Sequence, residues 1–504
     1  MMFSMPRHRV MNYLISICAC LTMVLNGYDG SLFSSIQVLQ TWNDYFGHPN
    51  ANLLGVINTA YSCAGILSGF FVCPILMDNF GRRLPIFLSG VTVAIGAFVM
   101  TFTPNLGGFI AGRAIVGFGT SLGGPAAPTL INELGYTNIR GRLMSFWQMF
   151  WSFGAILASY IALGGSYSPG LGNWQWRLPV IFQVFTPLIL CSTIYICPET
   201  PRYLLQNGKE EAARRALQRV RLPEEVEPEL TEIKEAILYE RTHTKGRYRQ
   251  LFVNASYRKR IILAFILNFG QQMTGIGSLT NYSGIIYQQV FKSSNTIILL
   301  NAINWILAVL FVLTATYFSD KWGRKTLLFW GALGQAATLL GVSTLVTQSH
   351  TNPDGTKSVG VGAGTALFFY LFNLFYQPSF GCTTWIWTCE IFPMVIRANG
   401  VAIGSQTQGI AQIILAQAFP PLLLAAGFYT FYFFMGVNLI LAVFVWFFIP
   451  ETRGVSLEHM DVLFGGIDHV VGGEKVLYRE DGGEIINEPQ DKHDNRTLVH
   501  NEKS

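Results

Sequence analysis

The chain has 504 residues, of which 51% are hydrophobic and only 12% charged, and its formal net charge is +5. Soluble domains average about 25% charged residues, so this composition argues against a soluble domain, a disordered chain and a nucleic-acid-binding protein. All eight cysteines lie inside apolar runs or at their ends, which favours buried thiols over a disulfide framework. We expect neither a metal site nor a cofactor.

Twelve apolar runs are long enough to cross a membrane, which takes roughly 20 mostly apolar residues. Six of them precede a polar stretch, near residues 10–33, 51–76, 84–102, 108–131, 143–164 and 178–197. Six more follow it, near residues 261–291, 296–319, 326–347, 363–389, 399–425 and 428–449. The first run follows basic residues as a secretory signal does, but it lacks a small-residue cleavage site, so we interpret it as a retained helix.

These runs predict an all-α membrane protein built from two six-helix bundles. The first bundle is expected over residues 1–197 and the second over 261–449. Between them, residues 198–260 form a linker in which short amphipathic helices rich in Glu, Arg and Ala are expected. The tail, 450–504, is rich in glycine and charge, and we expect it to be cytosolic and largely disordered.

Lysine and arginine gather in the loops on one side of the predicted membrane. The loops 34–50, 103–107 and 165–175 contain neither residue type, whereas Arg82, Arg83 and the linker lie on the opposite side. Cytosolic loops carry an excess of Lys and Arg. The pattern therefore predicts a multi-pass membrane protein with both termini in the cytosol, and we expect its location to be the plasma membrane.

Short motifs recur in the two halves of the chain and in the same order. They are M-D-N-F-G-R-R (77–83) and S-D-K-W-G-R-K (319–325), the pairs Glu133/Arg140 and Glu390/Arg397, and P-E-T at 198–200 and 450–452. Each half has an even number of spans, so the two halves have the same orientation. Such parallel repeats are typical of transporters that rock around a central site.

These motifs resemble the sugar porter family of the major facilitator superfamily, particularly its fungal lactose-permease and hexose-carrier members. Further matching segments are G-Y-D-G (27–30), G-R-A-I-V-G-F-G (112–119), P-E-T-P-R-Y-L (198–204), Q-Q-M-T-G-I-G (271–277) and P-E-T-R-G-V-S-L-E (450–458). The resemblance implies a carrier, not an enzyme, that moves a mono- or disaccharide with a proton by alternating access. It also implies a functional monomer in the lipid bilayer.

Asp29 lies inside a predicted spanning helix, where an acid costs about 2.5–3.5 kcal/mol to insert and is functional by default. Arg113 lies near the outer end of the fourth helix, so the two side chains could share a depth. The resemblance places both at the family's proton-coupling pair. The alternative is a static buried ion pair.

The resemblance also implies a set of gating residues at the cytosolic ends of the helices: Asp78, Gly81, Arg82, Arg83, Glu133, Arg140, Glu199, Arg202, Asp320, Gly323, Arg324, Glu390, Arg397 and Glu451. Charges on neighbouring helix ends would lock together when the cytosolic side is closed. The alternative is that the basic members serve only as topology signals.

By resemblance, the substrate-binding residues are Gln148, Gln271, Gln272, Asn281, Tyr282, Gln408 and Phe380. Amides can hydrogen-bond to sugar hydroxyls, although a single intramembrane Gln often only joins helices. The sequence departs from the family at Gly277, where an Asn is usual, at Phe380, where a Trp is usual, and at Ala308, where an Asn is usual. We therefore expect a wider and less polar pocket than a glucose site.

Two other functions remain open. The same scaffold could carry a non-sugar fungal metabolite such as a quinate-like acid, or the chain could be a nutrient receptor that does not transport.

Overall fold

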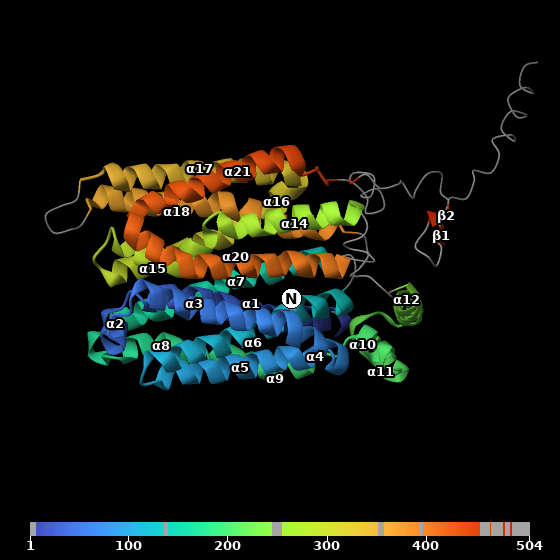
Figure 1. The fold of residues 1–504 in the computed structure, drawn as a ribbon. Coiled ribbons are helices and arrows are strands. Elements are labelled where there is room, and N and C mark those ends of the chain that lie inside the picture. The colour runs from blue at the N-terminus through green and yellow to red at the C-terminus, as the bar shows by residue number, and fades with distance from the viewer. Residues whose placement is uncertain are drawn as a thin grey trace, which may run out of the picture.

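The computed structural model of this protein describes residues 7–135, 140–243, 255–350, 357–392 and 397–453, together with Phe464 and two short strands. Long helices run side by side in one elongated bundle (Figure 1). The strands β1 (Leu477–Tyr478) and β2 (Glu484–Ile485) form an antiparallel pair. The rest of the tail beyond Arg453, apart from Phe464, and with it the predicted disorder, lies outside the described residues.

The first half supplies six spans. They are α1 (Arg7–Ile36), α3 (Ala51–Ile66) with α4 (Cys73–Phe80), α5 (Arg83–Phe102), α6 (Leu106–Leu134), α7 (Arg140–Ser166), and α8 (Trp174–Phe182) with α9 (Phe185–Thr193). A π-helical segment, Leu67–Val72, joins α3 to α4, and the short helix α2 (Gln40–Phe46) follows α1.

The second half repeats this arrangement. Its helices are α14 (Ala255–Met273) with α15 (Ile276–Gln288), α16 (Ser294–Trp322), α17 (Arg324–Gln348), α18 (Val359–Tyr376) with α19 (Thr383–Glu390), α20 (Arg397–Ala426), and α21 (Thr430–Phe448). Gly275, with φ +101°, separates α14 from α15, so the seventh span is broken near its middle.

The described residues contain eleven helical runs that are long and apolar enough to cross a membrane. The last of them, Gln406–Phe448, contains most of α20 and all of α21. A turn at Gly427, with φ +54°, divides these two helices. Counted separately, they complete the twelve spans predicted from the sequence.

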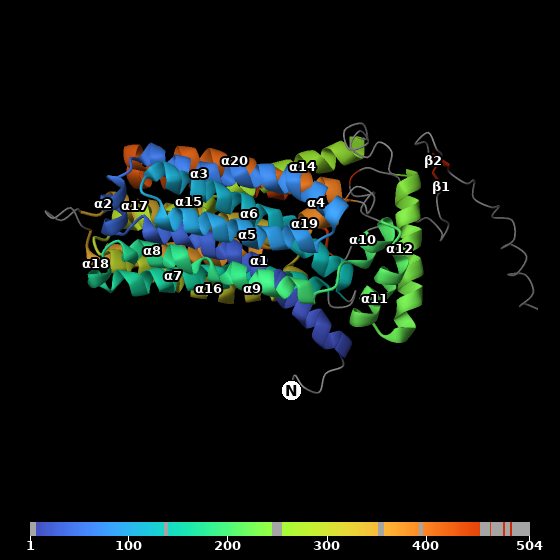
Figure 2. The same ribbon diagram turned by 90° about the horizontal axis from the view of Figure 1, so that it is seen from below.

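The linker forms a small helical unit at one end of the bundle (Figure 2). It consists of α10 (Pro201–Gln206), α11 (Glu210–Val220) and α12 (Pro223–His243). Ala213 and Leu217 of α11 pack against Val226 and Leu230 of α12 in a buried apolar cluster. This cluster gives the linker its own core.

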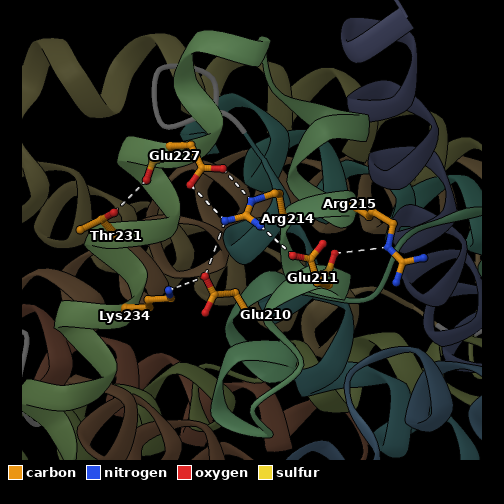
Figure 3. Close-up of polar contacts among 7 residues, drawn as sticks. All are labelled: Glu210, Glu211, Arg214, Arg215, Glu227, Thr231 and Lys234. Carbon is orange, nitrogen blue, oxygen red and sulfur yellow. Dashed lines mark hydrogen bonds and ion pairs between the residues drawn. The ribbon is translucent and has the colours of Figure 1, made fainter.

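A network of exposed charges also joins α11 to α12 (Figure 3). The Arg214 guanidinium lies between Glu211, at 2.9 Å, and Glu227, at 2.6 Å. The Lys234 ammonium lies 2.6 Å from Glu210, and its hydrogen bond lowers the pKa of that carboxyl group. Solvent screens such pairs, so they add little to the stability given by the apolar cluster.

Glycine allows helices within the first half to touch along their backbones. A Cβ on Gly27 of α1 would lie 1.8 Å from the Trp151 carbonyl oxygen of α7, and one on Gly154 would lie 2.1 Å from the Val24 carbonyl oxygen. Only residues without a side chain permit this approach. Helices α1 and α7 therefore pack as one rigid pair.

The two halves meet in the middle of the bundle and toward the end opposite the linker. The hydrogen-bonded pairs between halves are Ser31 with Trp305, Gln37 with Asn281, Val38 with Gln288 and Ser294, and Thr59 with Gln417. The end opposite the linker is therefore closed by contacts between the halves. The sequence analysis predicts that this end faces outside.

Candidate functional site

A buried ion pair lies in the first half, between α1 and α6. The Arg113 Nη1 atom lies 2.7 and 2.8 Å from the two carboxylate oxygens of Asp29. Asp29 is 0% exposed and Arg113 is 3% exposed. The two residues that the sequence analysis paired are thus in direct contact, away from solvent.

Further contacts orient this pair. Gln183 donates a hydrogen bond to Asp29 Oδ1 at 3.1 Å, and Arg113 Nη2 donates to Asn58 Oδ1 at 3.1 Å. The Arg113 guanidinium also lies 4.7 Å from the centre of the Tyr61 ring, a cation–π distance. Gln183 and Asn58 were missed by sequence analysis, although each is an amide inside an apolar run, which is the signal that could have found them.

The predicted amide cluster lies in the second half. Gln271 is buried, and its Nε2 atom donates to the Phe380 carbonyl oxygen at 2.7 Å and to the Tyr376 hydroxyl at 3.3 Å. Its Oε1 atom is buried and accepts no hydrogen bond from the part of the chain that the structure describes. A buried acceptor without a partner is costly. A donor such as a sugar hydroxyl would satisfy this oxygen if the surrounding helices opened.

Gln408 and Gln272 have different surroundings. The Gln408 Nε2 atom donates to Asn268 Oδ1 at 2.7 Å, and Asn268 in turn donates to the Thr388 hydroxyl at 3.0 Å. Gln272 is half-buried. A Cβ built on Gly277 would lie only 3.2 Å from Gln272 Oε1, so a side chain at this position would crowd the Gln272 amide.

Asn281 and Tyr282 lie at the boundary between the halves. The Asn281 carbonyl accepts from Gln37, and the Tyr282 hydroxyl donates to the Ala416 carbonyl oxygen at 2.6 Å. The Phe380 ring is fully buried, and the Gln148 side chain lies outside the described residues. In this conformation Asn281 and Tyr282 take part in closure or packing.

At the linker end of the first half, Arg82 Nη2 lies 2.8 Å from Glu133 Oε1. The Glu199 carboxylate accepts from the backbone N–H groups of Arg82 and Arg83, at 3.0 and 3.3 Å. Gly81, with φ +89°, permits this, because a Cβ there would lie 2.5 Å from Glu199 Oε2. The predicted gate residues of this half thus form one cluster.

The second half has an equivalent cluster. Arg324 Nη2 lies 2.9 Å from Glu390 Oε1, and the Glu451 carboxylate accepts from the backbone N–H groups of Arg324 and Lys325 at 2.9 and 3.0 Å. Gly323, with φ +86°, has the same role as Gly81. The recurring motifs therefore build the same geometry twice.

The other predicted gate residues are placed less fully. Asp78 is exposed at the end of α4, and Arg202 lies in the first turn of α10. The side chains of Arg140, Arg397 and Asp320 lie outside the described residues.

Two buried arginines beside these clusters were missed by sequence analysis. Arg221, at the end of α11, donates to the Leu134 and Gly135 carbonyl oxygens at 2.8 and 3.1 Å and pairs with Glu229 at 2.6 Å. Arg260, in α14, donates to the Ile391 carbonyl oxygen at 2.8 Å. Nothing in their local sequence distinguishes them from the other linker arginines.

Comparison with known proteins gives one family. Residues 15–464 match the family described as "Sugar (and other) transporter". A probable quinate permease of Aspergillus fumigatus is 27% identical over 473 residues, which cover 90% of this chain and 87% of the permease. A high-affinity glucose transporter of Kluyveromyces lactis is 26% identical, covering 92% of this chain and 87% of the relative. Sugar transport protein 7 of Arabidopsis thaliana is 29% identical, covering 84% and 81%.

Solved structures show the same fold. The major facilitator superfamily proton:xylose symporter XylE, bound to 6-bromo-6-deoxy-D-glucose, matches with a TM-score of 0.73 and 24% identity, covering 91% of this chain and 100% of that chain. The inward open conformation of XylE from E. coli also gives a TM-score of 0.73, with 23% identity over 90% of this chain and 99% of that chain.

Proposed function

This chain belongs to the sugar transporter family of the major facilitator superfamily, and on that premise we propose that it carries a sugar across a membrane together with a proton. The proposal rests chiefly on the Asp29–Arg113 pair, a buried carboxylate and guanidinium between two spanning helices. Ionisable residues inside a membrane typically mark ion or proton pathways.

In the proposed cycle, Asp29 loads a proton when the outer side opens and releases it toward the linker side. Protonation removes the negative charge that holds Arg113, which frees the guanidinium to move. A gradient of about 2 pH units and roughly 100 mV supplies on the order of 5 kcal/mol per proton. That energy supports an accumulation of about 10³-fold to 10⁴-fold.

The amide cluster is the proposed substrate site. The unpaired acceptor of Gln271 and the neutral amides of Gln272 and Gln408 suit the hydroxyl groups of a neutral sugar. The sugar transporters among the relatives support this choice.

The quinate permeases among the relatives favour a second candidate, a carboxylated polyol. A carboxylate would need a cation beside it when buried. The polar side chains of the cluster, Gln271, Gln272 and Gln408, are neutral amides and supply no such cation. We therefore favour the sugar.

We also propose a membrane, an orientation and an oligomeric state for the carrier. We place it in the plasma membrane with both termini in the cytosol, acting as a monomer. The positive charge of the linker side supports this orientation.

Uptake by a yeast strain without sugar transporters tests the function. The strain would express the full chain and receive radiolabelled hexoses, pentoses, disaccharides and quinate. We expect concentrative uptake of at least one sugar that collapses when a protonophore is added. Uptake of quinate alone would favour the second candidate. A chain that reaches the membrane but moves none of these compounds would contradict the carrier function and favour a receptor.

A further inference from the structure

A small recess lies inside the second half, and its lining includes none of the amides Gln271, Gln272 and Gln408. Its volume is about 30 Å³, and it lies between α15, α16 and α18. The hydroxyl-bearing and amide side chains that line it are Thr280, Ser283, Tyr287, Asn301, Asn304 and Asn373. A cavity of about 10–15 Å³ or more already holds one water molecule. The recess therefore suits one hydroxyl-sized group and is too small for a sugar ring.

Asn301 lines this recess and has an unused hydrogen-bond donor. The residue is only 3% exposed, and its Nδ2 atom is buried with no hydrogen-bond partner among the described residues. Its neighbours are joined to one another, because Asn373 donates to Asn304 at 3.2 Å and Gln377 donates to Asn373 at 3.0 Å. Buried donors are almost always paired. A missing acceptor at Asn301 therefore needs an explanation.

The lining of the recess indicates the chemistry of that acceptor. Aromatic rings of Phe369, Phe372 and Trp305 form its apolar walls. The residues that line it include no lysine, arginine or histidine. An anionic carboxylate would be desolvated there without a balancing charge. The acceptor that fits is a neutral hydroxyl oxygen.

The recess also lies close to the proposed substrate site. Thr280 follows Gly277 by three residues on α15, so both lie on one face of that helix. Trp305, which lines the recess, donates to the Ser31 hydroxyl of the first half at 3.1 Å. The recess thus adjoins the boundary between the halves, where a carried molecule must bind.

We propose that this recess receives the exocyclic hydroxymethyl group of the sugar, with Asn301 Nδ2 donating to its oxygen. The proposal rests on the sugar-carrier function and adds a specificity element to it. A pentose or a 6-deoxyhexose lacks this hydroxyl and leaves the Asn301 donor unpaired. The carrier should therefore distinguish sugars by this one group.

The test compares a transported hexose with its 6-deoxy analogue. In the unmodified protein, we expect the 6-deoxy sugar to compete for uptake about tenfold less well. In Asn301→Ala, the apparent affinity for the hexose should fall about tenfold, whereas that for the 6-deoxy sugar should stay nearly unchanged. Ser343→Ala is the matched control, because Ser343 is a buried hydroxyl of the same half that donates to the Phe428 carbonyl, outside the recess. It should leave the preference intact.

Three results would overturn the proposal. If the unmodified protein takes up both sugars equally well, the recess does not recognise the hydroxymethyl oxygen. The sugar-carrier function would still be supported in that case. If Asn301→Ala weakens both sugars equally, the side chain is structural and a water molecule satisfies it. If no sugar is moved at all, the proposal falls together with the carrier function. The first comparison needs no variant, so poor folding of Asn301→Ala cannot obscure it.

Discussion

Arg221 of the linker and Arg260 of α14 make equivalent contacts with the two halves of the molecule. Each donates to the backbone carbonyl of the residue that directly follows a predicted gate glutamate, Leu134 after Glu133 and Ile391 after Glu390. The last carbonyls of a helix lack partners within it and carry partial negative charge. Each arginine therefore caps a helix whose end carries the glutamate of a predicted gate ion pair.

Removing the Arg221 cap should destabilise the protein. Arg221→Ala leaves Glu229 and two carbonyl groups without their partner, and we expect a loss of about 3 kcal/mol. Arg214→Ala is the control, because its ion pairs lie on the exposed surface of the linker, and little change is expected. Thermal unfolding of the purified protein in detergent measures both. Equal shifts would contradict the distinction.

Proton coupling should depend on Asp29. Asp29→Asn keeps the shape of the side chain but cannot load or release a proton, so uphill accumulation and its pH dependence should vanish while downhill exchange persists. Concentrative uptake in proteoliposomes, with and without a protonophore, is the measurement. Accumulation that survives in Asp29→Asn and still collapses with the protonophore would assign the proton to another group.

Arg113→Ala removes the partner of the same acid and should impair coupling as well as stability. It leaves a fully buried carboxylate uncompensated, which costs roughly 3–5 kcal/mol. Arg177→Ala, at a partly buried arginine of the first half that contacts Tyr45, is a suitable control. Coupling should survive that change. If Arg113→Ala still shows coupled uptake, the Asp29–Arg113 contact is a static structural ion pair and does not take part in proton coupling.

Substrate affinity should depend on Gln271. Gln271→Ala removes the unpaired acceptor and should raise KM about tenfold or more, since one buried hydroxyl left unpaired costs about 1–3 kcal/mol. Gln335→Ala, another buried amide with an unpaired Oε1 atom, lies in α17 and serves as the control. Kinetics of radiolabelled uptake separate KM from the maximal rate. An unchanged KM for every transported compound would exclude this amide from the binding site.

The gate pairs should control the rate of transport more than affinity. Glu133→Gln weakens the contact with Arg82 at the linker end, distant in the sequence from the amide cluster. We expect the maximal rate to fall about tenfold, equivalent to about 1.4 kcal/mol, with KM nearly constant. Glu390→Gln should likewise lower the maximal rate and leave KM nearly constant. Initial uptake rates normalised to surface abundance decide this, and a change confined to KM would argue against a gating role.

Orientation can be tested by cysteine labelling of intact cells. Gly170→Cys places a thiol in the loop opposite the linker, where a Cβ meets nothing within 4 Å. Gln218→Cys places one on the exposed face of α11. An impermeant reagent should label the first and not the second. The reverse pattern would invert the predicted topology.

The helices were largely predictable because hydropathy and helix length are strongly constrained in a membrane. The breaks within the helices were less predictable. The predicted run 261–291 is divided at Gly275, whose positive φ cannot be inferred from hydropathy. Asp29 and Arg113 were predictable because charged residues are rare in spans.

The site could be predicted only in part, because the sequence does not show in which direction each side chain points. Asn281 and Tyr282 match the family's binding positions, yet here they contact Gln37 and the Ala416 carbonyl. A sequence match fixes a position along a helix but not the partner that covers it in one conformation. Arg221 was missed for a related reason, since its partners are backbone carbonyls distant in the sequence.

The contacts of the linker helices determine which of the two bundles these helices move with. Asn12 donates to the Val220 carbonyl, Tyr203 donates to the Asn79 carbonyl, and Arg221 holds the end of α6. Each of these bonds attaches the linker helices to the first bundle. These helices should therefore move together with that bundle when the halves rock. The moving body that contains Asp29 and Arg113 would then also include α10, α11 and α12.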